Sequence, residues 1–134
     1  MKNKFKIGIA TCLLSLGVTS AVSANWVSST MDVPGGNESA YGEDQEVSFN
    51  SKDTYSTNAT FYTRSRSSYS GMDARIVNSN KVSRSDWARN MNEGDTIYVS
   101  TTASKGYNYN IEISSDWTQS GTDSISFSYS PDSE

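Results

Sequence analysis

The feature of this sequence that most limits its fold is an alternation of apolar and polar residues with a period of two. The clearest case places Tyr107, Tyr109, Ile111 and Ile113 on one face, with Asn or Glu between them. The pattern returns at Ile125, Phe127 and Tyr129, with serines between. Successive side chains of a β-strand point to opposite faces, so this alternation predicts strands with one buried face.

Six short segments carry this strand pattern, and Gly, Asn, Asp and Ser, which are typical of turns, separate them. They are residues 46–49, 59–63, 74–77, 96–100, 107–113 and 125–129. After residue 24 the chain has no Leu and much Ser and Thr, which disfavours helices. We therefore expect an all-β fold, a small antiparallel β-sandwich of about six to seven strands over residues 46–134. Residues 82–89 form either a further strand, which we favour, or one helical turn capped by Ser85 or Asp86.

Residues 1–24 have the features of a secretory signal peptide. Three lysines within the first six residues precede an apolar stretch, residues 7–22, and Val22-Ser23-Ala24 supplies a small-x-small cleavage site before Asn25. The single cysteine, Cys12, lies inside the apolar stretch and would leave with the signal. We therefore expect a secreted, extracellular protein that is more acidic than the formal charge of −4 for the whole chain.

Residues 25–45 show no such alternation. They contain two turn-forming sequences, Pro34-Gly35-Gly36-Asn37 and Gly42-Glu43-Asp44. We interpret this segment as a flexible N-terminal arm, mobile or loosely docked on the sandwich.

The absence of two residue types excludes several chemistries. The sequence has no His, which removes Ser-His-Asp catalysis and the commonest zinc ligand. A mature chain without Cys has neither a thiol nucleophile nor a disulfide. We therefore expect a protein that binds rather than catalyses, with no cofactor and no metal.

The basic residues of the mature chain are concentrated between Thr54 and Arg89, where aromatic residues are interleaved with them. The candidate binding residues are Arg64, Arg66, Arg75, Lys81, Arg84, Trp87 and Arg89. Such a surface can bind an anionic cell-envelope polymer or a lipid headgroup, with transient membrane contact. Export and the acidic total argue against nucleic acid. Alternatively, these cations only balance the acidic strands inside the fold.

Aromatic side chains suggest a second function, binding of glycans by stacking on sugar rings. The candidates are the three tryptophans. Trp26 lies near the N-terminus that cleavage before Asn25 would create, and we expect it to be exposed. The mature chain has no Leu to fill a core, so we expect Trp87 and Trp117 to be buried there.

Carboxylates suggest further alternatives. Two of Glu112, Asp116 and Asp123 could form the acid pair of a glycoside hydrolase if a cleft held them together. Calcium could bind at residues 43–46 or 93–95, although neither has EF-hand spacing. The alternating segments 107–115 and 124–130 could also pair as a pore-forming hairpin, but the second is short for a membrane span.

Several short motifs carry a resemblance over residues 63–133. They are Tyr129-Ser130-Pro131-Asp132-Ser133, the turn and strand from Asn92 to Val99, and Gly106-Tyr107-Asn108-Tyr109. With these the chain resembles small exported β-proteins of Gram-positive bacteria, whose function is unassigned. Arg84-Ser85 and Trp87-Ala88 also resemble the lactococcin 972 bacteriocin group, but this chain lacks the His-bearing segments of that group. The resemblance implies a bacteriocin-like or cell-envelope-binding role and assigns no site residue.

Overall fold

The computed structural model describes residues 24–66 and 71–133, so all but the last residue of the predicted signal peptide, 1–24, lies outside the described residues. Eight strands form in this part of the chain, together with the short 3-10 helix η1 (Gly42–Gln45). The strands are β1 (Val27–Val33), β2 (Ser39–Tyr41), β3 (Asn50–Ser51), β4 (Asn58–Arg66), β5 (Asp73–Val77), β6 (Thr96–Ser100), β7 (Asn108–Ser114) and β8 (Asp123–Ser130).

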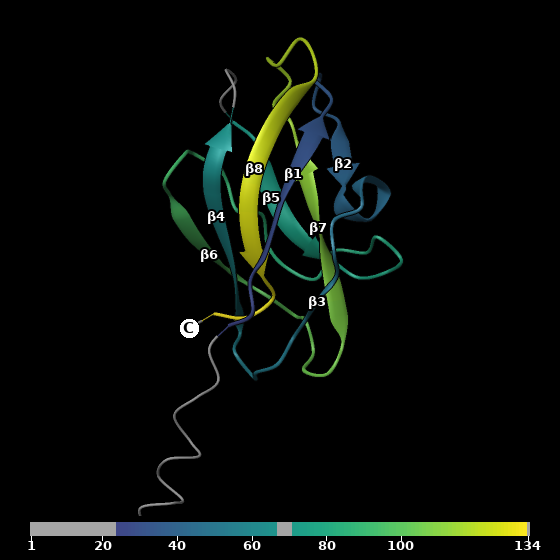
Figure 1. Cartoon of the computed structure of the whole chain (residues 1–134), viewed down its shortest axis with the longest axis vertical. Helices are drawn as coiled ribbons and strands as arrows, with labels where there is room; N and C mark the ends of the chain where they lie inside the picture. Colours follow the sequence, from purple (N-terminus) through teal and green to yellow (C-terminus); the bar gives the residue numbers. More distant parts are fainter. Residues whose placement is uncertain (1–23, 67–70, 134) are drawn as a thin grey trace, which may run out of the picture.

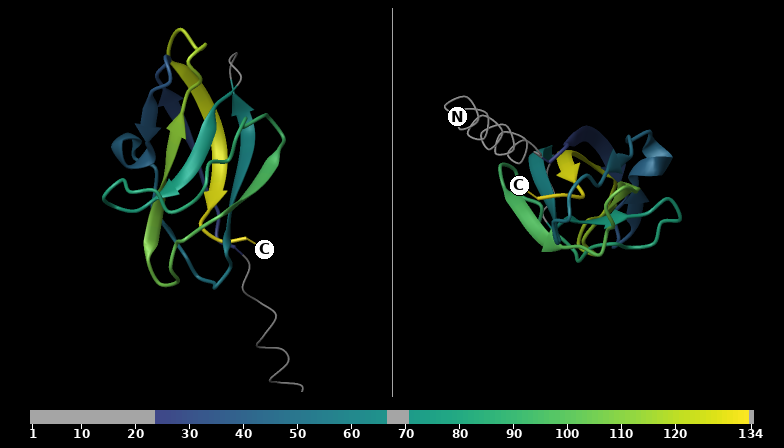
Figure 2. Two further views of the ribbon diagram at one scale, coloured as in Figure 1. Left: turned by 180° about the vertical axis from the view of Figure 1, so that it is seen from behind. Right: turned by 90° about the horizontal axis from the view of Figure 1, so that it is seen from below.

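The strands form two antiparallel sheets that face each other (Figures 1 and 2). The first sheet has the order β1-β8-β4-β6. In the second, β7 pairs with β2, β3 and β5. Strands β2 and β5 lie along opposite edges of β7, because Ile113 lies opposite both Ala40 and Ala74. The predicted all-β sandwich is confirmed, with β8 and β7 as central strands.

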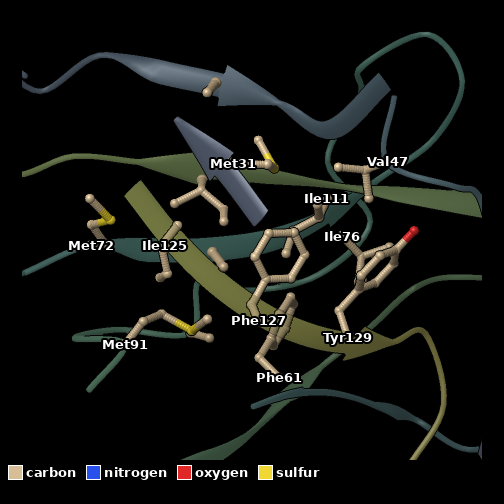
Figure 3. Close-up of a cluster of buried hydrophobic side chains, with 14 of the residues drawn as sticks. Met31, Val47, Phe61, Met72, Ile76, Met91, Ile111, Ile125, Phe127 and Tyr129 are labelled. Atoms are coloured by element: carbon tan, nitrogen blue, oxygen red, sulfur yellow. The ribbon is translucent and has the colours of Figure 1, made fainter. Parts of the chain in front are cut away.

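The core lies between the sheets and follows the predicted alternation (Figure 3). Phe61, Phe127 and Tyr129 from the first sheet meet Ile76, Ile111 and Ile113 from the second, all fully buried. The Tyr129 hydroxyl donates hydrogen bonds to the Ser48 and Tyr109 carbonyls at 2.7 and 3.1 Å, which satisfies the polar end of a buried ring.

The expectation that Trp87 and Trp117 belong to this core is wrong. Trp117 is 78% exposed, and Trp87 is half-buried outside the core cluster. Three fully buried methionines, Met31, Met72 and Met91, occupy the interior instead. An unbranched thioether side chain adapts to irregular gaps that a rigid indole cannot fill.

The N-terminal segment 25–45 is part of the sandwich and not the arm that its turn residues suggested. Strand β1 pairs with β8 over its whole length, from Val27 opposite Tyr129 to Val33 opposite Asp123. Its outward residues are Ser, Thr and Asp, and Met31 and Val33 are its only fully buried residues, so the alternation was too weak to see. Segment 46–49, by contrast, is not a strand, although Val47 is buried.

The segments considered as a possible pore hairpin lie in different sheets. β8 pairs with β1 and β4, whereas β7 pairs with β2, β3 and β5. Two polar residues of β7, Asn110 and Glu112, are also not solvent-facing as the alternation suggested. Asn110 is buried with its amide donating to the Val47 carbonyl, and Glu112 is buried beside Arg75.

Residues 83–88 are extended, as favoured, and form isolated bridges rather than a complete strand. Ala88 exchanges both backbone hydrogen bonds with Ala74 of β5, and the Arg84 amide donates to Ile76. On its other side the segment bonds to the end of β6, where Asp86 donates to Ser100 and Thr102 donates to the Arg84 carbonyl. The segment therefore covers the edge of β5 and joins the two sheets.

The C-terminal motif Ser130-Pro131-Asp132-Ser133 closes one end of the sandwich. The buried Lys52 ammonium donates to the Pro131 carbonyl at 2.8 Å and to the Asp132 carboxylate at 2.9 Å. The same carboxylate accepts hydrogen bonds from the Asp53 amide and from the Thr54 amide and hydroxyl. Burial raises the pKa of Asp132, but these hydrogen bonds and the Lys52 charge together hold it below its ordinary value.

Candidate functional site

The structure does not bring the seven predicted binding residues to one surface. Arg64 and Arg66 lie on β4 of the first sheet, and Arg75 lies on β5 of the second. Lys81, Arg84, Trp87 and Arg89 lie on the connection between β5 and β6. Most of these side chains have partners within the protein.

Arg75, Trp87 and Arg89 form a stack outside the second sheet. The Arg75 guanidinium lies 4.3 Å from the centre of the Trp87 ring, and that of Arg89 lies 5.8 Å from it. Arg75 Nε also lies 2.5 Å from Glu112 Oε2, and Arg89 Nη1 lies 2.5 Å from Asp73 Oδ2. Both cations are thus neutralised by acids of neighbouring strands, as the charge-balance alternative expects.

Two more predicted cations, Lys81 and Arg66, also have partners within the protein. Both carboxylate oxygens of Asp44 accept from the Lys81 ammonium at 2.8 Å, and this ammonium lies 5.0 Å from the centre of the Tyr41 ring. The hydrogen bond to Asp44 raises the pKa of Lys81. Arg66 donates to the Met91 carbonyl at 3.2 Å.

Arg84 differs from these residues because it borders concave surface. Three adjoining hollows surround the connection between β6 and β7, and we call them together the hydroxyl groove. The largest, about 590 Å³, is lined by Lys52 and by residues 54–57 and 101–106. The second, about 400 Å³, includes Arg84 and Tyr107, and the third, about 270 Å³, includes residues 83–86. Thr102 borders all three hollows, so they lie next to one another.

The side chains of the hydroxyl groove are of three kinds. Hydroxyls predominate, from Thr54, Ser56, Thr57, Thr101, Thr102 and Ser104. Lys105 and Arg84 add positive charge, and none of the ion pairs among residues 24–66 and 71–133 involves either of them. Tyr55 and Tyr107 are 85% and 66% exposed, and the Lys105 ammonium lies 4.7 Å from the Tyr55 ring centre. Asp86, in the smallest hollow, is the one acid among the lining residues.

Backbone hydrogen bonds hold the groove in place. The Gly106 amide donates to the Lys52 carbonyl, and the Lys52 amide donates to Tyr107. Gly106 has φ of 90°, a conformation that L side chains rarely adopt, so this tight turn requires glycine. The Thr101 amide donates to Thr57, and the Thr101 hydroxyl donates to the Arg84 carbonyl at 2.6 Å. These bonds anchor both the strand connection and the backbone of Arg84.

Sequence reasoning found Arg84 but missed Lys105 and Tyr55. Lys105 stands alone among Ser, Thr, Ala and Gly, outside the basic segment. The available signal was the lack of any acid between Thr96 and Tyr107, which leaves this cation without a local partner.

The three carboxylates considered for hydrolysis have separate partners. Glu112 accepts from Arg75 and from the Ser39 hydroxyl, Asp116 accepts from the Thr118 amide, and Asp123 accepts from the Ser124 amide. Glu112 lies in the second sheet and Asp123 in the first, so they do not share one strand pair.

The segments considered for calcium are 43–46, in and after η1, and 93–95, before β6. In the first, Asp44 holds Lys81, and the Gln45 side chain binds the backbone of Asp32. Among residues 24–66 and 71–133 there is no group of three or more acidic, His or Cys side chains that could hold a metal ion.

Comparison with protein-family models, curated proteins and solved structures finds no match to this chain. No helix in the described part of the chain is long and apolar enough to cross a membrane.

Proposed function

We propose that this is a small secreted, non-enzymatic protein that binds an anionic polymer of the bacterial cell envelope through the hydroxyl groove. The observation that carries the proposal is that Arg84 and Lys105 border adjoining hollows of this groove and form no ion pair among residues 24–66 and 71–133. Arg66, Arg75, Lys81 and Arg89 already bond to other groups of the protein and have less capacity to attract a ligand.

The groove chemistry suits a phosphate- or carboxylate-bearing chain with sugar or polyol units. Guanidinium and ammonium groups donate charge-assisted hydrogen bonds to anionic oxygens. Hydroxyls of Thr and Ser both donate and accept, so they can bind neutral hydroxyls between the anionic groups. Tyr55 and Tyr107 offer exposed rings at the two larger hollows.

A pull-down on cell walls of Gram-positive bacteria, at low and moderate salt, tests the proposal. Retention should fall with salt, because exposed charges are screened. Arg84→Ala should weaken retention, and Arg84→Ala/Lys105→Ala should weaken it further. Arg89→Ala is the matched control, since it removes the same charge from a side chain that is 65% exposed but paired with Asp73.

Two results would refute the proposal. One is no retention of the wild type at either salt, and the other is equal retention of the double variant and wild type. Spotting the protein on lawns of related bacteria separates the two forms of the hypothesis. Inhibition supports a bacteriocin-like action, and retention without inhibition supports envelope binding alone.

A further inference from the structure

The outer face of the first sheet is a second surface with a composition of its own. Strand register places one row of side chains across all four strands: Ser28, Ser128, Tyr62 and Thr96. The same face also carries Thr30 of β1, Ser126 of β8 and Tyr98 of β6. It is therefore a face of hydroxyls and aromatic rings, opposite to the face that packs in the core.

Trp26 extends this surface from the start of β1. It is 40% exposed and, with Tyr62, Thr96 and Ser128, lines a hollow of about 200 Å³. The intervening strand β8 carries serines on this face, and their small side chains leave room between the indole and the Tyr62 ring. We call Trp26, Tyr62 and Tyr98, with these hydroxyls, the aromatic sheet face.

Trp26 is held in position by its neighbours. The Asn25 carbonyl accepts a hydrogen bond from the buried Asn50 amide at 2.8 Å, and the Asn25 side chain donates to Asp53. On the other side, Val27 pairs with Tyr129. Because the chain is held on both sides of Trp26, little backbone entropy is lost when a ligand stacks on its ring.

Tyr98 adds a second exposed ring. It is 59% exposed, and it is the diagonal neighbour of Tyr62, since Thr96 lies directly opposite Tyr62. Diagonal neighbours lie about 7–8 Å apart on one face, within reach of aromatic side chains. The rings of Trp26, Tyr62 and Tyr98 therefore lie on strands from one edge of the sheet to the other.

The hydroxyls of this face are ordered and keep capacity to bond outward. Ser28 Oγ lies 2.7 Å from Ser128 Oγ, and Thr30 Oγ1 lies 2.7 Å from Ser126 Oγ. In each pair one O–H bonds the other oxygen, which leaves the second O–H and several lone pairs for a ligand. A ligand that matches them needs both donors and acceptors and an apolar face for the rings.

The geometry points to the aromatic sheet face as a binding site for a neutral polysaccharide with flat pyranose rings. The C–H face of such a sugar stacks on aromatic rings, and its equatorial hydroxyls both donate and accept. The rows through Tyr62 and Tyr98 contain no charged side chain, which disfavours an anionic ligand here. The inference is independent of the proposed function, because it uses a different surface and a ligand without charge.

Binding to insoluble cellulose and chitin, and calorimetry with cellohexaose and chitohexaose, test this inference. The wild type should bind at least one of the two polysaccharides, with little dependence on salt. Trp26→Ala/Tyr98→Ala should weaken binding at least fivefold. Trp117→Ala is the matched control, since it removes a tryptophan that is more exposed but lies in the connection between β7 and β8. Circular dichroism checks that each variant is folded.

A spectroscopic readout locates the ligand. In Trp87→Phe/Trp117→Phe, Trp26 is the only tryptophan of the described chain, and bound oligosaccharide should protect its fluorescence from acrylamide. Arg84→Ala/Lys105→Ala should bind neutral glycan as the wild type does, which separates this inference from the proposed function.

Three results would overturn the inference. The first is that the wild type binds neither polysaccharide. The second is that Trp26→Ala/Tyr98→Ala and Trp117→Ala lose the same amount of glycan affinity. The third is that bound oligosaccharide does not protect Trp26 fluorescence from acrylamide. A change in sedimentation of Trp26→Ala/Tyr98→Ala from dimer to monomer, without a change in glycan binding, would assign the face to a second copy of the chain instead.

Discussion

Replacing Lys52 with Met tests whether the C-terminal motif is a structural closure. Lys52 and Asp132 are fully buried, and their charged atoms lie 2.9 Å apart. In Lys52→Met the side chain still fills the space, but the Asp132 carboxylate keeps only its bonds to Asp53 and Thr54. Removing one partner of a buried pair costs about 3–5 kcal/mol, a large part of the total stability of a small domain.

Lys81→Met is the matched control for this substitution. The Lys81–Asp44 pair has a similar N···O distance of 2.8 Å, but its side chains are 39% and 56% exposed. Solvent screens an exposed pair of this kind, so it contributes much less to stability than a buried pair. Urea unfolding followed by circular dichroism measures the free energy of unfolding of both variants. The reasoning would be refuted if Lys52→Met lost no more of this free energy than Lys81→Met.

The same pair makes a prediction for acid stability. The pKa of Asp132 is lowered in the folded protein, so its carboxylate stabilises the fold above the ordinary Asp pKa. That stability is lost as the pH falls through the lowered folded pKa. Lys52→Met removes one of the groups that lower this pKa, so the variant should lose stability at a higher pH than the wild type. Urea unfolding between pH 2 and pH 5 measures the difference, and identical pH profiles would contradict it.

Three further substitutions follow from particular contacts. Gly35→Ala should lower the free energy of unfolding in urea by about 1–3 kcal/mol, because the added Cβ would lie 2.4 Å from the Gln119 carbonyl oxygen. Gly121→Ala should change this free energy little, because its added Cβ would have no atom within 4 Å. Glu112→Gln should lower the free energy of unfolding by about 2 kcal/mol and alter the near-ultraviolet circular dichroism of Trp87, because it removes the charged partner of Arg75. An unchanged spectrum would argue against the stack of Arg75 on Trp87. Gln45→Ala should promote self-association, measured by sedimentation, because the Gln45 amide bonds to the backbone N–H and C=O of Asp32 on edge strand β1. Unchanged sedimentation would show that Gln45 does not protect this edge from pairing with another chain.

The fold class was predictable because the alternation of β4, β7 and β8 is strong and their apolar residues do pack in the core. Strand β1 was missed because its inner face begins with Val27 and Ser29, which are only partly buried, so the apolar side of the alternation is short. The separation of β7 and β8 into different sheets was also missed, since alternation gives the faces of a strand and not its partners. Pairing depends on contacts far apart in sequence, such as Val27 with Tyr129.

The candidate site was predictable only in part. Charge counting found Arg84, but it could not distinguish this side chain from Arg75 and Arg89, whose acidic partners Glu112 and Asp73 are supplied by the folded sheets. Lys105 and Tyr55 were missed because the connections that bring them together are about fifty residues apart in sequence. Trp26 was expected to be exposed and is, but its neighbours Tyr62 and Thr96 follow only from strand order.

The most direct test of the proposed function is the affinity of the purified protein for poly(glycerol phosphate), measured by calorimetry over a range of salt concentrations. The account predicts binding that weakens steadily with salt in the wild type and in Arg89→Ala, and much weaker binding with a smaller salt dependence in Arg84→Ala/Lys105→Ala. No binding by the wild type at low salt, or the same affinity and salt dependence in all three proteins, would contradict it.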